Sequence, residues 1–288
     1  MIWLFVIGSL HAHLFWFGDI LRIYALCGLL LLLFPIHKGK TTLRWAIALA
    51  VPITAIAFIA QQLTPYLTSD YPSGEQMERA FKEGTYWEIV KMNWAIDPIR
   101  HFQKDSILTL MSTLGKVLLG VWLAQKGFFT NAANFRTMRR KWLIWGSTLG
   151  LGSSLAFLAI HKGLLDMESP WLLWVPFVVA GGLLLHALMY LSLFSWLFEK
   201  WQGKVIVLLA AVGRMSLTNY LAQTVLGMLM FYGIGLGFWG KVSYLTMILI
   251  GLAFFVLQIV GSRFWLRRFE IGPIEKTWRK LSGFGTGR

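Results

Sequence analysis

Long apolar runs dominate this chain, and short loops rich in Lys and Arg separate them. A helix needs roughly 17–25 predominantly apolar residues to cross a bilayer. Few folds are open to such a chain, because backbone polar groups inside lipid must be satisfied internally. The runs lie at residues 2–17, 20–34, 43–62, 107–125, 142–160, 171–198, 205–232 and 244–265. They predict an all-α, polytopic integral membrane bundle with about eight transmembrane segments.

The composition and the placement of charge support this prediction. The sequence is 57% hydrophobic and 14% charged, whereas soluble domains carry about 25% charged residues. A formal net charge of +14 would suggest nucleic acid as the partner of a soluble protein. Here the basic residues lie in short loops between apolar runs, a pattern typical of membrane orientation. We therefore expect the lipid bilayer as partner and no nucleic acid, and the oligomeric state stays open.

The distribution of basic residues predicts the topology. Lys and Arg gather in the tail and in loops 37–42, 126–141 and 199–204, which places both termini in the cytoplasm. The only long polar stretch, residues 64–104, then forms an extracytoplasmic loop. Residues 77–94 can form an amphipathic helix within it, either on the surface or as a lid over a membrane site. No internal repeat divides the chain, so we expect a single transmembrane domain over residues 1–288.

One segment of the seventh run is polar where its surroundings are apolar. On a helix, Ser216, Asn219, Tyr220 and Gln223 are three or four residues apart and form one stripe. Such a stripe should face protein or a watery cavity, because polar groups in lipid are costly. Arg214 can bind a carboxylate or phosphate with its planar guanidinium. We expect these five residues to bind the polar part of a substrate.

Plainer interpretations of the same residues stay open. Arg214 can extend its charge to the lipid headgroups, and Asn219 and Gln223 can simply hydrogen-bond between helices. The seventh run is also too long for one straight helix. Either the spanning helix begins near residues 213–214, or it begins near residue 204 and Arg214 lies deep in the membrane.

A second polar group lies near the front of the chain, where His11 is followed by Asp19. Histidine can take and return a proton near neutral pH, and a nearby carboxylate can orient the ring and stabilise its cation. The alternative is structural: His11 donates one hydrogen bond between helices, and Asp19 caps the helix that begins at Ile20. As candidate catalytic residues we take His11 and Asp19.

Several signatures are absent from the sequence. It has no phosphate-binding loop, no Cys/His metal spacing and no G-x-S-x-G nucleophile motif. Its one cysteine, Cys27, lies in an apolar run and fits a buried, inert thiol. We expect no metal site and no permanently bound cofactor.

Three motifs in order resemble the YeiB-type bacterial membrane proteins (domain of unknown function 418). They are residues 10–21 with Tyr24 and Gly28, residues 213–221, and residues 272–279. The resemblance implies a bacterial inner-membrane protein. A more distant resemblance is to the transmembrane acyltransferase superfamily, in which a histidine stands where this chain has Gln223. Family members begin with two or three further helices that include an Asp-x-x-Arg-Gly element, so this chain is expected to be short at its N-terminus.

The resemblance implies an acyltransferase-like activity, with an acyl-coenzyme A thioester as donor on the cytoplasmic side and a small-molecule or glycan acceptor at or beyond the outer face. In this hypothesis His11 is the general base or acyl carrier, Asp19 orients it, and the polar stripe binds substrate. A permease for a small anionic solute, with Arg214 as its binding charge, is the first alternative. A non-catalytic membrane scaffold is the second.

Overall fold

The computed structural model describes residues 1–36, 39–63, 71–99, 104–164, 174–201 and 203–283. Within these residues the protein is helical and contains no strand, which confirms the all-α prediction. Parts of the predicted extracytoplasmic loop, residues 64–70 and 100–103, lie outside the described residues. The same holds for residues 37–38 and 202 of two predicted cytoplasmic loops.

Several helices are long and apolar enough to cross a membrane. Among the described residues there are five, and six if one bent pair of helices is counted as a single span. The five are Gly39–Ala60, Ser106–Gln125, Arg136–Ile160, Val175–Lys200 and Tyr244–Trp265. Two further apolar helices are shorter, Ile2–Leu14 and Leu21–Leu33. The count of eight is therefore not confirmed, and the cytoplasmic position of both termini stays a prediction.

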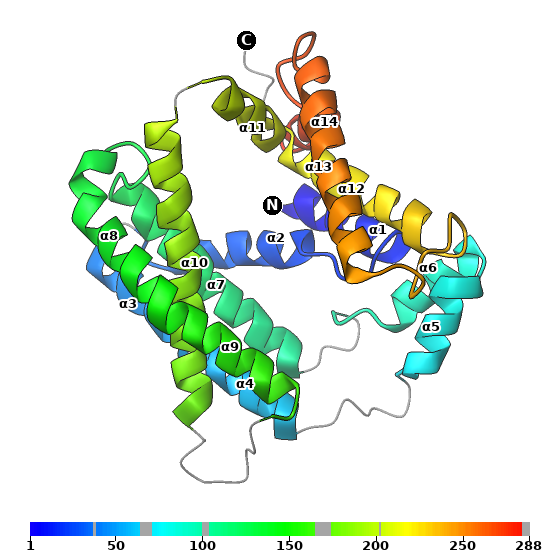
Figure 1. Ribbon diagram of the computed structural model, residues 1–288, viewed down its shortest axis with the longest axis horizontal. Coiled ribbons are helices and arrows are strands. Elements are labelled where there is room, and N and C mark those ends of the chain that lie inside the picture. The colour runs from blue at the N-terminus through cyan, green and yellow to red at the C-terminus, as the bar shows by residue number, and fades with distance from the viewer. Residues whose placement is uncertain (37–38, 64–70, 100–103, 165–173, 202, 284–288) are drawn as a thin grey trace. The chain divides into compact units, whose positions relative to one another are not determined.

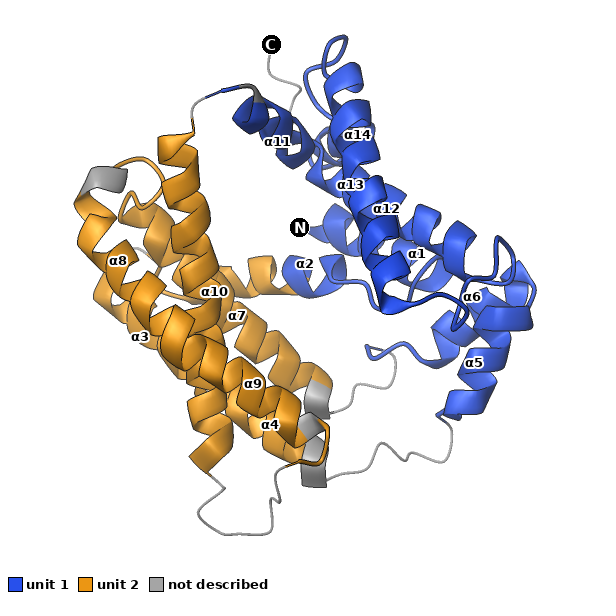
Figure 2. Ribbon diagram, viewed as in Figure 1, with its two compact units in different colours: residues 1–25, 68–101, 202–288 blue, residues 26–67, 102–201 orange. Residues whose placement is uncertain are grey.

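The chain divides into two compact units, shown in different colours in Figure 2. One unit, residues 26–67 and 102–201, is built from long apolar helices. They are α3 (Gly39–Ala50), α4 (Pro52–Leu63), α7 (Lys104–Gln125), α8 (Arg136–Trp145), α9 (Leu151–His161) and α10 (Val175–Lys200). Helix α7 packs along α3 and α4, and α10 packs along α4, α8 and α9 (Figure 1).

Small residues permit this close helix packing. A Cβ built on Gly115 of α7 would lie 2.4 Å from the backbone nitrogen of Ala50 in α3, so only glycine fits. Glycine and alanine at helix contacts are a common device of membrane bundles, because backbones can then approach closely. A π-helical turn, Gly146–Gly150, joins α8 to α9.

The other unit comprises residues 1–25, 68–101 and 202–288. Its helices are α1 (Ile2–Leu14), the start of α2 (Leu21–Leu30), α5 (Gly74–Glu83), α6 (Tyr86–Ala95), α11 (Lys204–Arg214), α12 (Ser216–Phe231), α13 (Tyr244–Trp265) and α14 (Pro273–Leu281). Helix α1 packs against α6 and α14, and α14 packs against α12. All predicted site residues belong to this unit.

The polar loop contains two helices where the sequence pattern favoured one over residues 77–94. Helix α5 ends before Gly84, and Thr85 begins α6 with its own capping box, in which Thr85 and Glu88 exchange hydrogen bonds. Phe81 of α5 packs against Tyr232 and Trp239, with ring centroids 4.9 and 5.5 Å apart respectively. The loop helices are therefore tied to the segment that follows α12.

The seventh apolar run is broken at Met215. Helices α11 and α12 meet there at an angle of 81°, and Arg214 is the last residue of α11. Helices begin both at Lys204 (α11) and at Ser216 (α12), so the helix boundaries agree with parts of both alternatives, and the depth of Arg214 in the membrane stays a prediction. This break separates Arg214 from the helix that carries the rest of the polar stripe.

Candidate functional site

His11 and Asp19 form a buried pair. Nδ1 of His11 lies 2.7 Å from Oδ2 of Asp19, and the two residues are 3% and 5% exposed. Helix α1 carries His11, and the turn between α1 and α2 brings Asp19 back to it. Because a carboxylate only accepts, Nδ1 carries the proton in this bond, and Nε2 of the neutral ring is then an acceptor.

Asp19 makes both of the contacts that the two interpretations of its position require. Its Oδ1 atom accepts a hydrogen bond of 3.0 Å from the backbone N–H of Arg22, which satisfies a free donor in the first turn of α2. Its other oxygen, Oδ2, holds His11. Helix capping therefore fixes the carboxylate in the orientation that the histidine needs.

A second ion pair, which the sequence pattern did not predict, lies beside the first. Arg22 is 3% exposed and donates from Nη1 to Oδ2 of Asp97 over 2.8 Å. Nε2 of His13 lies 2.9 Å from the same oxygen. Arg22 is also close to Asp19, with Nε and Oδ1 3.9 Å apart. His11, Asp19, Arg22, Asp97 and His13 thus form one connected series of five charged or titratable groups, with His11 at one end.

The Asp97 carboxyl is stabilised in its charged form. Burial raises its pKa, but the hydrogen bond from Arg22, the N–H of Ile99, the charge of Arg22 and the bond with His13 together lower the pKa below its usual value. A carboxylate with several donors around it behaves in this way. Asp97 is therefore a fixed negative charge that balances the buried Arg22.

The Nε2 atom of His11 has no hydrogen-bond partner among the described residues, although it is buried. Buried polar atoms are satisfied in the great majority of cases, so an exception calls for an explanation. An imidazole held by a carboxylate, with its other nitrogen free, is the arrangement of a general base. Within the described part of the chain, no group of three or more His, Cys, Asp or Glu side chains could hold a metal ion.

Tyr220 joins this pair to helix α12. Its hydroxyl donates to Oδ2 of Asp19 over 3.4 Å and accepts from the backbone N–H of Ile20 over 3.4 Å. Its ring centroid lies 5.1 Å from that of His11. Of the predicted polar stripe, Tyr220 is the residue that contacts the His11–Asp19 pair.

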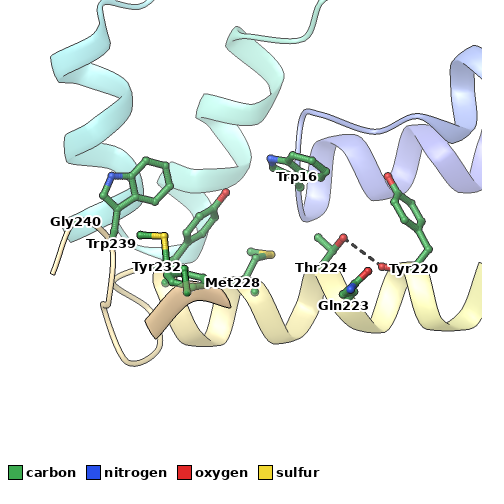
Figure 3. Close-up of a pocket in the computed structure, with 11 residues that line it drawn as sticks. Trp16, Tyr220, Gln223, Thr224, Met228, Tyr232, Trp239 and Gly240 are labelled. Carbon is green, nitrogen blue, oxygen red and sulfur yellow. Dashed lines mark hydrogen bonds between the residues drawn. The ribbon is translucent and has the colours of Figure 1, made fainter. Parts of the chain in front are cut away.

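A pocket of about 520 Å³ extends from Tyr220 along α12 (Figure 3). Its lining is mostly apolar and comes from one unit: Trp16, Tyr220, Gln223, Thr224, Gly227, Met228, Phe231, Tyr232, Trp239, Gly240 and Met247. Gln223 lies near the Tyr220 end, and Trp239 and Gly240 lie at the opposite end (Figure 3). Two members of the predicted stripe, Tyr220 and Gln223, therefore face this pocket.

Asn219 faces another helix. Its side-chain amide donates to Oγ of Ser262 in α13 over 3.0 Å and to the carbonyl of Val212 over 3.2 Å. Gln258 of α13 donates to the backbone carbonyl of Asn219 over 2.8 Å. This is the interhelical hydrogen bonding that the plainer interpretation of Asn219 predicts.

Arg214 and Ser216 lie at the break between α11 and α12. Both are exposed, and the Arg214 guanidinium donates to the backbone carbonyl of Glu270. Ser216 is the first residue of α12. The structure therefore brings His11, Asp19 and Tyr220 into contact and adds Gln223 along the pocket. In the described contacts, Arg214, Ser216 and Asn219 do not reach the His11–Asp19 pair.

Comparisons with known proteins agree on one family. The family model described as "Protein of unknown function (DUF418)" matches residues 123–284. The chain is 29% identical to "Uncharacterized protein YxaH" of Bacillus subtilis, and the match covers 97% of this chain and 69% of that protein. It is 27% identical to "Uncharacterized protein YeiB" of Escherichia coli, over 97% of this chain and 73% of that protein. No solved structure matches the chain.

Proposed function

The chain belongs to the DUF418 family of YeiB-like proteins, and we propose that it is a membrane-bound acyltransferase. The names of these relatives give no activity, so the proposal rests on the geometry of the site. The protein would move an acyl group from a coenzyme A thioester to a hydroxyl acceptor at the outer face. Since the relatives are bacterial, we place it in the inner membrane as a multi-pass protein. The coenzyme A donor rests on the distant resemblance to the transmembrane acyltransferase superfamily.

The observation that carries the proposal is the free Nε2 of His11, opposite a ring nitrogen held 2.7 Å from Asp19. In the proposed step, Nε2 removes the proton of an acceptor hydroxyl while that oxygen bonds to the thioester carbonyl carbon. The C–S bond then breaks, its electron pair goes to sulfur, and the imidazolium gives its proton to the thiolate. The products are an ester and a thiol. Asp19 keeps the ring in the required tautomer and stabilises its cation.

The burial of the pair supports this role. His11 and Asp19 are buried, and in a buried site a fixed carboxylate stabilises the charge of an imidazolium more strongly than it would in solvent. The buried Arg22–Asp97 pair lies next to Asp19. The charges of Arg22 and Asp97 largely compensate each other. The negative charge of Asp19 therefore remains available to stabilise the His11 cation.

The transport alternative has less support from the contacts. Arg214, the charge that a permease would use for an anionic solute, donates to the Glu270 carbonyl at an exposed helix break. Uptake of a labelled anion into proteoliposomes, without covalent change to the solute, would favour transport over acyl transfer.

The proposal is tested with the full-length protein in proteoliposomes of bacterial polar lipid, supplied with radiolabelled acetyl-coenzyme A. We expect label to pass to lipid or to an added sugar, and His11→Gln to lower the rate by about 100-fold or more, the usual range for a general base. His186→Gln is the matched control, because His186 is also a helix histidine, bonded to Ser154 over 2.7 Å in the other unit. If His11→Gln transfers label as fast as the unmodified protein, the assignment of His11 is wrong.

A further inference from the structure

The pocket beside Tyr220 is long and follows one side of a helix. Tyr220, Thr224 and Met228 line it at four-residue intervals, so they lie on one side of α12, and Tyr232 follows directly after the helix. At 1.5 Å per residue the helical part of this row is about 12 Å long. The pocket volume of about 520 Å³ lies within the usual range for organic ligands, roughly 300–1,000 Å³.

The two ends of the pocket differ in chemistry. Tyr220, Gln223 and Thr224 bring hydroxyl and amide groups to one end, and Met228, Trp239 and the ring of Tyr232 make the other end mostly apolar (Figure 3). A ligand that satisfies both ends has a polar head and a long hydrocarbon chain. The polar end is also the end that contacts Asp19 through the Tyr220 hydroxyl.

The surroundings of the pocket point to the source of such a ligand. Helix α12 is one half of a bent pair of apolar helices that could form a broken membrane span or a re-entrant loop, and neighbouring apolar side chains such as Val225 and Leu229 are exposed by 39% and 49%. Apolar residues exposed on a spanning helix face lipid. A molecule that reaches this pocket from lipid is itself a membrane amphiphile.

We propose that the pocket holds the fatty chain of the acyl acceptor, and that this acceptor is a membrane alcohol of the monoacylglycerol type. Its hydroxyl would lie at the Tyr220 end, next to the residue that contacts both Asp19 and the His11 ring, and its chain would run toward Trp239. This inference rests on the proposed function, since it names the acceptor for the same transfer. The acceptor oxygen forms the new ester bond, and the thioester sulfur leaves with the transferred proton.

Gly227 provides a direct test of occupancy. It lines the pocket, and a Cβ built on it meets no atom within 4 Å, so a larger side chain there enters the pocket space without a clash at Cβ. Gly251 of α13 has the same open surroundings and is outside the lining. Gly227→Leu should therefore displace a ligand, and Gly251→Leu is its matched control. Gly227→Ala gives a smaller obstruction at the same position.

The experiment uses the full chain in phosphatidylcholine nanodiscs with a monoacylglycerol that carries a diazirine in mid-chain. After irradiation, we expect labelling to concentrate on the α12 peptide that contains Met228 and Phe231. An excess of unlabelled monoacylglycerol should suppress it about tenfold. Gly227→Leu should lower this labelling about tenfold, Gly227→Ala less, and Gly251→Leu should leave it unchanged. Equal thermal midpoints for the three variants would show that all are folded.

Four results would overturn the proposal. They are equal α12 labelling in Gly227→Leu and the unmodified protein, labelling spread evenly over the apolar helices, no suppression by unlabelled monoacylglycerol, and competition by farnesol but not by monoacylglycerol. The two readouts also test the lipid site and the transfer activity separately. Labelling of α12 without acetyl transfer would support the lipid site and reject acyl transfer. Acetyl transfer to a sugar without labelling of α12 would support acyl transfer and reject the lipid site. His11→Gln should keep the labelling and lose the transfer.

Discussion

Gly8 of α1 lies directly against the carboxylate of Asp19. A Cβ built on Gly8 would come within 2.7 Å of Oδ1 of Asp19 and within 2.9 Å of the backbone nitrogen of Arg22. Gly8 and His11 are three residues apart and share a face of the helix. The missing side chain therefore lets α1 approach closely enough for His11, one turn later, to reach the other oxygen of the same carboxylate.

Gly8→Ala should consequently damage the site. The added methyl group meets a backbone atom that cannot move freely, and overpacking of this kind costs about 1–3 kcal/mol. We expect a lower thermal midpoint in detergent and a loss of acetyl transfer, because the His11–Asp19 contact is pushed apart. Gly251→Ala is the control: its Cβ meets nothing within 4 Å, and alanine stabilises a helix interior by roughly 0.5–1 kcal/mol over glycine. An unchanged midpoint in Gly8→Ala would show that α1 can shift without cost.

Tyr220→Phe removes only the hydroxyl that bonds to Asp19 and Ile20. The net value of one hydrogen bond is about 0.5–1.5 kcal/mol, so we expect acetyl transfer to fall by about 2- to 10-fold. Labelling by the monoacylglycerol probe should persist, because the aromatic wall of the pocket is kept. Tyr190→Phe, on α10 of the other unit, should leave both measurements unchanged. A transfer rate equal to that of the unmodified protein would remove Tyr220 from the positioning of Asp19.

The apolar runs predicted the long helices well, because span length and hydrophobicity alone select a helix in lipid. Residues 107–125 and 244–265, for example, correspond to α7 and α13. The break between α5 and α6 was missed, although the sequence contains its signal. Thr85 with Glu88 three residues later is a capping box, and it starts a new helix inside the predicted amphipathic segment.

The site was only partly predictable from the sequence. A contact between residues that are close in sequence can be expected, and Asp19 is only eight residues from His11. The contact between Arg22 and Asp97 joins residues 75 positions apart, and no local pattern predicts it. The burial of Arg22 had a local signal, since an arginine in an apolar run must find a partner. The polar stripe was divided because adjacent residues on a helix differ by about 100° in direction. Asn219 thus faces α13 while Tyr220 faces Asp19.

Asp97 should make stability depend on acidic pH. Its pKa in the folded protein lies below the usual value, which is about 3.9 in an unfolded chain. The unfolded state therefore binds the proton first, and stability falls as pH drops from about 4 through the lower folded pKa. Asp97→Asn should lower the thermal midpoint at pH 7, since a hydrogen bond to a charged group contributes about 1.5–3 kcal/mol. It should also flatten the decline between pH 5 and pH 2.

Glu88→Gln is the control for this pH profile. The pKa of the Glu88 carboxyl is also lowered, first by its backbone hydrogen bond to Thr85, but Glu88 lies on the surface and its amide replacement can still accept that bond. We expect Glu88→Gln to change the acid profile much less than Asp97→Asn does. Identical profiles for Asp97→Asn and the unmodified protein would mean that Asp97 gains nothing from Arg22.

Glu275 of α14 should stabilise the helix that carries Tyr220. Its carboxylate accepts from the backbone N–H of Thr218 over 3.0 Å and from the Thr218 hydroxyl. Thr218 is in the first turn of α12, where N–H groups have no partner within the helix and negative charge is favourable. Glu275→Ala leaves that N–H unpaired, so we expect a loss of about 1–3 kcal/mol and reduced acetyl transfer as α12 loosens.

Two further variants separate this role from a general effect of charge. Glu275→Gln keeps an acceptor oxygen and loses the charge, so its thermal midpoint should lie between those of Glu275→Ala and the unmodified protein. Glu270→Ala removes an exposed carboxylate from the same region, and the described contact of Glu270 is made by its main-chain carbonyl. Its stability should change by less than about 0.5 kcal/mol. If Glu270→Ala and Glu275→Ala lower the midpoint equally, the stabilisation comes from net charge near the tail, and the cap on Thr218 contributes nothing of its own.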